Sequence, residues 1–168
     1  MKPIIENLSV FTYTLGLACI ENYLLYVLNI NNYEYRHLYA KSFLPFFDIA
    51  VAFLKESASY AYFNKIERLV NVADKKGLIH FSAFNDLNEE IYRCDYCCLQ
   101  INSEFIKERY RGQIWRDDHY YLLSAIDGDT WTCLNDNPRE RIVFKYDELC
   151  NVYGGAGYCF TWVYVGNY

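Results

Sequence analysis

The spacing of the apolar residues changes halfway along the chain, and this change limits the possible folds more than any other feature. From Leu17 to Leu28 the apolar residues recur about every 3.6 positions, which is typical of an amphipathic helix, and the polar cluster Asn29 to Asn32 ends it. A second helix is predicted over Ala58 to Ala73, because Lys75-Lys76-Gly77 follows as a C-terminal signal. The first half is therefore predicted to be helical.

Short aromatic and aliphatic segments fill the second half and predict strands. Tyr120 to Ile126 and Thr130 to Leu134 flank Asp127-Gly128, a strong hairpin turn. The other predicted elements are strands over Cys97 to Ile101, Ile142 to Phe144 and Tyr158 to Val165, and short helices around Asp86 to Tyr92 and Asp147 to Val152. Helices followed by antiparallel strands predict an α+β fold, and 168 residues suit a single domain over residues 1–168.

The charge of the chain bears on its partners. A net charge of -5 argues against a nucleic-acid binder, which would carry a basic stripe, and against an anionic membrane surface. No apolar stretch reaches the ~20 residues that span a bilayer. A local basic cluster does occur, at Lys107, Arg109, Arg111 and Arg116. It is either a solvated surface or a dock for an acidic partner.

The seven cysteines are interpreted as reduced thiols. A secreted disulfide scaffold more often has an even number of cysteines in a shorter chain. Cys94, Cys97 and Cys98 include the CxxC spacing of zinc sites, but Cys133, Cys150 and Cys159 form no second pair to complete four ligands. We therefore expect no metal and a cytoplasmic location.

Cys19 and His119 are the residues most suited to chemistry. Cys19 begins the first predicted helix, where the macrodipole stabilises a thiolate and lowers the thiol pKa. His119 begins a strand, and a nearby imidazole would act as the base. Asp136 is the first choice for the group that fixes the imidazole tautomer, with Asn135 second. The alternative is that Cys19 only packs in the core. His37 and His80 are interpreted as structural or surface residues.

These segments resemble a family of cysteine enzymes. Gly16-Leu17-Ala18-Cys19 heads a helix, His119 heads a strand before the Asp127-Gly128 turn, and Asn135-Asp136-Asn137-Pro138 ends the next strand. In this order they resemble the papain superfamily, in the branch of bacteriocin leader peptidases and of the stand-alone butirosin-type and closthioamide-type amide-forming enzymes. The resemblance implies a papain-like cysteine protease fold, a helical lobe plus an antiparallel sheet, with Cys19 as nucleophile, His119 as base and Asp136 as orienting residue.

The resemblance also implies an acyltransferase or amide synthase of natural-product biosynthesis. Such an enzyme takes an acyl group from the phosphopantetheine thioester of an acyl or peptidyl carrier protein onto Cys19 and passes it to an amine. No other cofactor is expected, and Lys107, Arg109 and Arg111 would dock the acidic carrier.

Two other functions stay open. One is a cysteine peptidase that cleaves a peptide or leader sequence, and the other is a non-catalytic binding module of the same fold. Leader peptidases generally place a Gln six residues before the cysteine as an oxyanion donor, and here that position is Tyr13. This departure favours acyl transfer, because a thioester is already activated and needs a weaker oxyanion hole.

Overall fold

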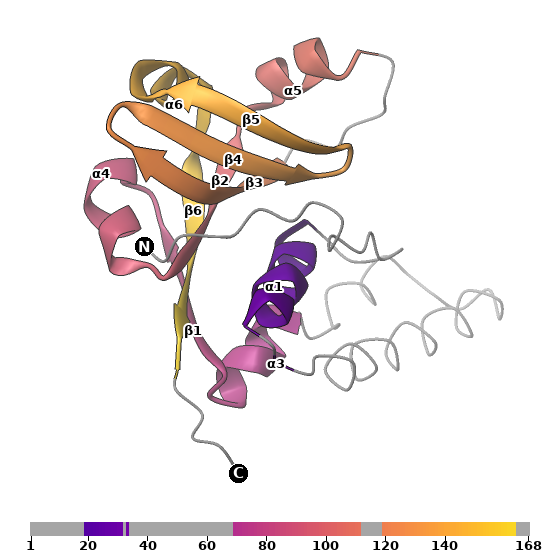
Figure 1. Cartoon of the computed structure of the whole chain (residues 1–168), viewed down its shortest axis with the longest axis vertical. Coiled ribbons are helices and arrows are strands. Elements are labelled where there is room, and N and C mark those ends of the chain that lie inside the picture. The colour runs from indigo at the N-terminus through magenta and orange to yellow at the C-terminus, as the bar shows by residue number, and fades with distance from the viewer. Residues whose placement is uncertain (1–18, 32, 34–68, 112–118, 164–168) are drawn as a thin grey trace, which may run out of the picture.

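The computed structural model describes residues 19–31, 33, 69–111 and 119–163. Their centre is a six-stranded sheet in the order β1-β6-β2-β3-β4-β5, and every neighbouring pair is antiparallel (Figure 1). The strands span Ile79–Phe84 (β1), Tyr96–Ile101 (β2), His119–Asp127 (β3), Thr130–Asp136 (β4), Arg139–Lys145 (β5) and Tyr153–Trp162 (β6).

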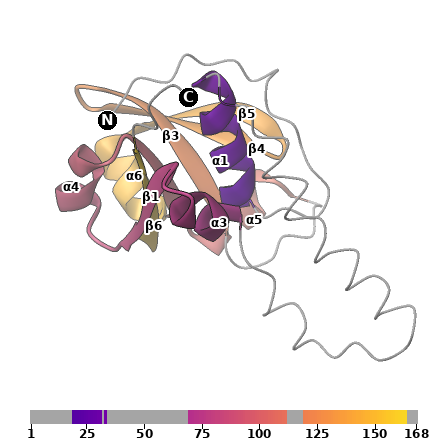
Figure 2. The ribbon, with the colours of Figure 1, turned by 90° about the horizontal axis from the view of Figure 1, so that it is seen from below.

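Helices cover both faces of this sheet. On one face lie α1 (Cys19–Ile30) and α3 (Leu69–Lys75), which are close together in Figure 2. The other face carries the short helices α4 (Leu87–Glu90), η3 (Ile91–Arg93), α5 (Ser103–Arg109) and α6 (Tyr146–Val152). None of the helices in the described segments is long and apolar enough to cross a membrane.

Strand β3 contributes side chains to two hydrophobic cores, one on each face of the sheet. Successive side chains of a strand point to opposite faces, so Tyr120 and Leu122 pack toward α1 while Tyr121 and Leu123 pack toward the other helices. A strand buried on both faces has a nearly continuous apolar sequence, as β3 does. The β3–β4 hairpin turns at Gly128, whose φ of 56° is the left-handed conformation that glycine adopts without strain.

Helix α1 is buried on all sides rather than along one stripe. Every residue from Ile20 to Leu28 is buried, including the polar residues Glu21 and Asn22. Burying a polar side chain costs free energy unless protein groups hydrogen-bond it, because water does not reach it. The partners of Asn22 form part of the site described below.

A disulfide joins Cys94, just before β2, to Cys159 in β6. The expectation that all seven cysteines are reduced is therefore wrong for this pair. The other described cysteines are free: Cys97, Cys98 and Cys133 are buried, Cys19 is half-buried and Cys150 is exposed. The segment with CxxC spacing thus contains one disulfide-bonded cysteine, Cys94, and two buried thiols, Cys97 and Cys98.

The papain-like fold class is also wrong. It required a helical lobe beside a separate antiparallel sheet, whereas in the described residues the six-stranded sheet builds both cores and the helices pack onto its two faces. Of the helix expected over Ala58 to Ala73, the described part is α3. The sheet is also larger than expected, because β1 was not predicted and β5 and β6 extend beyond the predicted strands.

Candidate active site

Cys19 is the first residue of α1 and lies against the backbone of β3. Its thiol accepts hydrogen bonds from the backbone amides of Tyr120 and Ile20, which lower the thiol pKa. Burial and then the charge of Asp136 act in the opposite direction and dominate, so the pKa of Cys19 is raised to about 12. The thiol is therefore protonated at neutral pH, contrary to the thiolate that a helix N-terminus alone predicts.

His119 is the first residue of β3 and pairs with Asn135 near the end of β4. Its Nε2 lies 2.7 Å from Asn135 Oδ1, and both side chains are buried. The imidazole also meets the ring of Tyr121 edge-on, with centroids 5.5 Å apart. These contacts fix the ring plane of His119 and leave Nδ1 on the side away from Asn135.

Asp136 does not take the role of partner to His119. Its Oδ2 accepts a hydrogen bond of 2.8 Å from Asn22 Nδ2, and its Oδ1 lies 3.4 Å from the hydroxyl of Tyr23. The Tyr23 hydroxyl also donates to the Tyr120 carbonyl oxygen at 2.6 Å. Asp136 is thus a buried carboxylate held by α1 on the side of the sheet where Cys19 lies.

The alternation of β4 separates the two candidate orienting residues. Neighbouring residues on a strand face opposite ways, so Asn135 shares the face of Tyr121 while Asp136 shares the face of α1. The structure therefore brings together His119 with Asn135, and Cys19 with Asp136. The backbone of Tyr120, which follows His119 and contacts the Cys19 thiol, connects the two pairs.

Sequence reasoning missed a hydrogen-bonded network behind His119. Asn135 Nδ2 donates to the hydroxyl of Tyr110 at 2.8 Å, and Tyr110 donates to Glu140. Arg109 binds both carboxylate oxygens of Glu140, through Nε at 3.1 Å and Nη2 at 2.9 Å. Nothing in the sequence marks Tyr110 or Glu140, because α5 and β5 become neighbours only in the folded sheet.

The remaining predicted residues do not join this site. Of the predicted basic cluster, Arg109 binds Glu140 in that network, whereas Lys107 and Arg111 lie outside it and are exposed. His80 is exposed, 3.6 Å from Asp74. Some residues used in the sequence analysis lie outside the described part of the chain: Tyr13, Gly16-Leu17-Ala18 before Cys19, His37 and Arg116.

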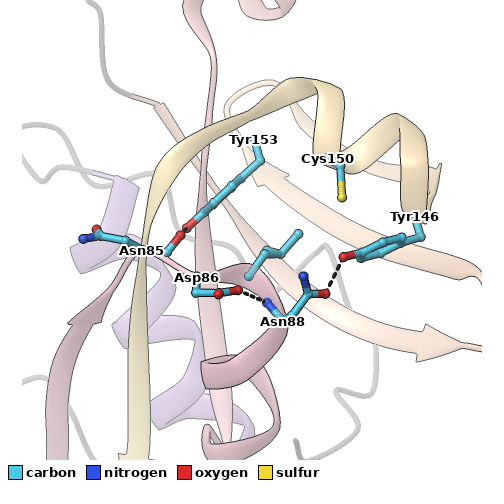
Figure 3. Close-up of a pocket in the computed structure, with 7 residues that line it drawn as sticks. Asn85, Asp86, Asn88, Tyr146, Cys150 and Tyr153 are labelled. Atoms are coloured by element: carbon cyan, nitrogen blue, oxygen red, sulfur yellow. Dashed lines mark hydrogen bonds between the residues drawn. The ribbon is translucent and has the colours of Figure 1, made fainter.

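A concavity apart from these residues lies on the sheet face opposite α1. It has a volume of about 410 Å³ and is lined by Asn85, Asp86, Leu87, Asn88, Tyr146, Cys150 and Tyr153 (Figure 3). Its exposed thiol, Cys150, hydrogen-bonds Tyr146 and so raises the pKa of that phenol. None of these described lining residues is a histidine. Within the described ranges, no cluster of three or more histidine, cysteine or acidic side chains is placed to hold a metal.

Comparison with known proteins assigns the chain to no family. No family model matches the sequence, and no curated protein matches it either.

Proposed function

We propose that this protein is a cysteine-dependent acyltransferase that forms amides, moving an acyl group from a carrier-protein thioester through Cys19 to an amine. The observation that carries the proposal is the 2.7 Å hydrogen bond between His119 Nε2 and Asn135 Oδ1. This bond is made one residue away from the Tyr120 amide that contacts the Cys19 thiol. A cysteine nucleophile is activated by an imidazole that contacts its thiol, so the proposal requires His119 Nδ1 to reach Cys19 Sγ past the backbone of Tyr120.

The first step forms the acyl-enzyme. His119 Nδ1 takes the thiol proton while Cys19 Sγ bonds to the carbonyl carbon of the donor thioester. The bond from that carbon to the donor sulfur breaks, and the imidazolium gives its proton to the departing thiolate. Because burial raises the pKa of Cys19 to about 12, proton removal accompanies attack instead of preceding it.

The second step transfers the acyl group. The amine nitrogen attacks the carbonyl carbon and His119 takes the proton that the nitrogen loses. The bond from that carbon to Cys19 Sγ breaks, and the imidazolium returns the proton to the departing thiolate. The backbone N–H of Cys19, at the first position of α1, is our proposed donor to the oxyanion, because amides of the first helical turn have no partner within the helix. With water as the acceptor the same residues would perform hydrolysis, which is the peptidase alternative.

The acidic carrier would dock beside α5. Lys107 and Arg111 are exposed there, and the guanidinium of Arg111 lies 3.9 Å from the carboxylate of Glu108. Lys107→Glu and Arg111→Glu should therefore slow turnover of the carrier-bound donor and spare a pantetheine donor, because complementary charge acts on the encounter. Lys145→Glu, an exposed charge reversal on β5, is the control. Equal losses on both donors would refute docking at α5.

A cytoplasmic site of action belongs to this proposal. The Cys94–Cys159 disulfide argues against it, since disulfides are rare in cytosolic proteins. Both cysteines are buried, so cells are lysed directly into denaturant that contains an alkylating reagent, and mass spectrometry of the two cysteine-containing peptides then decides between the compartments. Alkylated Cys94 and Cys159 would support the cytoplasm, and a protected pair would exclude it.

Intact-protein mass spectrometry tests the chemistry. The protein is incubated with octanoyl-pantetheine and with the same acyl group on a carrier protein. Wild type and Cys150→Ala should gain one octanoyl group, and Cys19→Ala should gain none. Cys150→Ala is the matched control because it removes an exposed thiol outside the site. Release of the adduct by amines identifies a transferase, and release by water alone identifies a hydrolase.

A specific observation favours a second candidate, a non-catalytic binding module. The Cys19 pKa of about 12 is typical of a packing thiol, and the neighbouring Asp136 opposes thiolate formation. An absence of adduct on wild type from both donors would establish this candidate over the enzyme.

A further inference from the structure

Five residues form a continuous chain from His119 to the protein surface. The order is His119, Asn135, Tyr110, Glu140 and Arg109, contributed by β3, β4, the end of α5, β5 and α5. In Figure 1, α5 lies close to the β5 end of the sheet, which is how these elements meet. Every link is a direct side-chain hydrogen bond. The direction of each bond can therefore be worked out from the groups that can only donate or only accept.

Glu140 sets the direction of the first links. Burial raises the pKa of its carboxyl, but hydrogen bonds from Arg109 and Tyr110 outweigh burial, and the pKa lies below its ordinary value. Burial first, and then the hydrogen bond to Glu140, raise the pKa of Tyr110 to about 12. At neutral pH the carboxylate therefore only accepts, and the single hydroxyl proton of Tyr110 is donated to it.

The remaining links follow from that proton. Tyr110 Oη, with its proton directed at Glu140, can only accept from its other neighbours, Tyr121 Oη at 2.9 Å and the Asn135 side chain at 2.8 Å. Only the amide nitrogen of Asn135 can donate to it. The Asn135 amide also lowers the pKa of Glu140, which agrees with an N–H directed toward the carboxylate.

Because Asn135 Nδ2 donates to Tyr110, Asn135 Oδ1 faces His119. An amide oxygen only accepts, so Nε2 of the imidazole must carry the proton in the 2.7 Å bond. Neutral His119 then has its lone pair on Nδ1. The opposite tautomer would place two acceptors against each other, and rotating the Asn135 amide would move the same conflict to Tyr110.

We infer that the Arg109–Glu140 ion pair, acting through Tyr110 and Asn135, fixes His119 in the Nε2–H tautomer and so makes Nδ1 its basic nitrogen. Arg109, Glu140 and Tyr110 are positioning residues, because they act on the imidazole only through Asn135. The tautomer follows from the hydrogen bonds alone. Its consequence for acyl transfer rests on the proposed function.

Nitrogen NMR of histidine-labelled protein tests the inference without any substrate. The chain has three histidines, so the resonances of His119 can be assigned with His37→Gln and His80→Gln. In wild type at a pH where His119 is neutral, we expect a protonated Nε2 and a non-protonated Nδ1. A protonated Nδ1 in wild type would overturn the inference, whatever any variant does.

Variants then test which residues set the direction of the hydrogen bonds that reach His119. In Glu140→Gln the new amide can donate to Tyr110 as well as accept, so we expect a mixture of the two tautomers; Tyr110→Phe should give the same mixture. Asp129→Asn, which alters a surface carboxylate 3.6 Å from Lys145, and Tyr146→Phe are matched controls that should keep the wild-type tautomer. Folded variants of Glu140 and Tyr110 that keep the pure Nε2–H form would refute the role of the ion pair.

The same variants separate this inference from the proposed function. If His119 is the base, a mixed tautomer should lower the acylation rate, up to the factor of about 10² to 10⁴ that general-base catalysis contributes. Arg109→Lys keeps the charge near Glu140 and should restore most of the rate and tautomer lost in Arg109→Ala. A shifted tautomer with no change in acylation would leave the inference standing and count against His119 as the base.

Discussion

Replacing Asp136 by Asn should make Cys19 more reactive. The substitution removes the charge that stands second, after burial, among the causes that raise the thiol pKa. It also preserves the packing, since an amide oxygen can accept from Asn22 Nδ2 and the amide nitrogen can face the Tyr23 hydroxyl. The carboxylate is therefore predicted to restrain the nucleophile, whereas the sequence alone suggested that it assists the base.

The magnitude follows from the pKa. The pKa of the Cys19 thiol rises from 9.0 to about 12, which corresponds to a free energy of about 4 kcal/mol opposing formation of the thiolate. Burial accounts for the largest share, so removal of the Asp136 charge should lower the pKa by on the order of one unit. At a pH well below the pKa values of both proteins, the thiolate fraction of Cys19 should then rise about tenfold.

The assay is the rate of iodoacetamide alkylation at Cys19 as a function of pH, followed by mass spectrometry of the Cys19 peptide. A Cys150→Ala background removes the exposed thiol, and Glu148→Gln changes an exposed carboxylate elsewhere as the control. The Asp136→Asn rate should exceed wild type about tenfold at pH 8, while Glu148→Gln matches wild type. An Asp136→Asn rate equal to or below wild type would refute the electrostatic reasoning.

Three further predictions concern the fold. Burial raises the thiol pKa values of Cys19 and Cys133 to about 12, so the folded state keeps protons that the unfolded chain loses above about pH 9. The free energy of unfolding in urea should therefore fall from pH 9 toward pH 12. A flat profile would contradict the burial of these thiols. Alkylation of the denatured, unreduced protein should modify five of the seven cysteines, because Cys94 and Cys159 are joined; seven modified cysteines would exclude the disulfide. In Gly157→Ala the new Cβ would overlap the ring of Phe84, so the variant should lose about 1–3 kcal/mol of stability, and an unchanged urea midpoint would show that the ring does not lie over Gly157.

Strong local signals explain which elements the sequence predicted. Helix α1, the β3–β4 hairpin and the short helix after Asp86 each have an apolar period or a turn residue that acts within a few positions. Strand β1 has no such pattern, because His80 and Ser82 are exposed and only Ile79 and Phe84 at its ends are buried. Helix α5 has one buried residue, Ile106, which is too few to produce a helical period.

Prediction of the candidate site from the sequence was limited by a different factor, the register of the strands. The sequence placed His119 and the pair Asn135-Asp136 on neighbouring strands, but the choice between the two residues depends on the face of β4 that each occupies. A shift of one residue in strand register reverses every face, and no local pattern near Asp136 sets that register. The link from Tyr110 to Glu140 spans 30 positions, and the disulfide spans 65. Both depend on strand order, which periodicity does not encode.

Cross-linking with dibromoacetone tests most directly whether Cys19 and His119 form one site. The reagent alkylates a thiol and then a nearby imidazole nitrogen, and peptide mass spectrometry identifies the bridge. The account predicts a bridge from Cys19 to Nδ1 of His119, because Nε2 is held by Asn135. A Cys19 that is alkylated only once, or a bridge to Nε2, would contradict it.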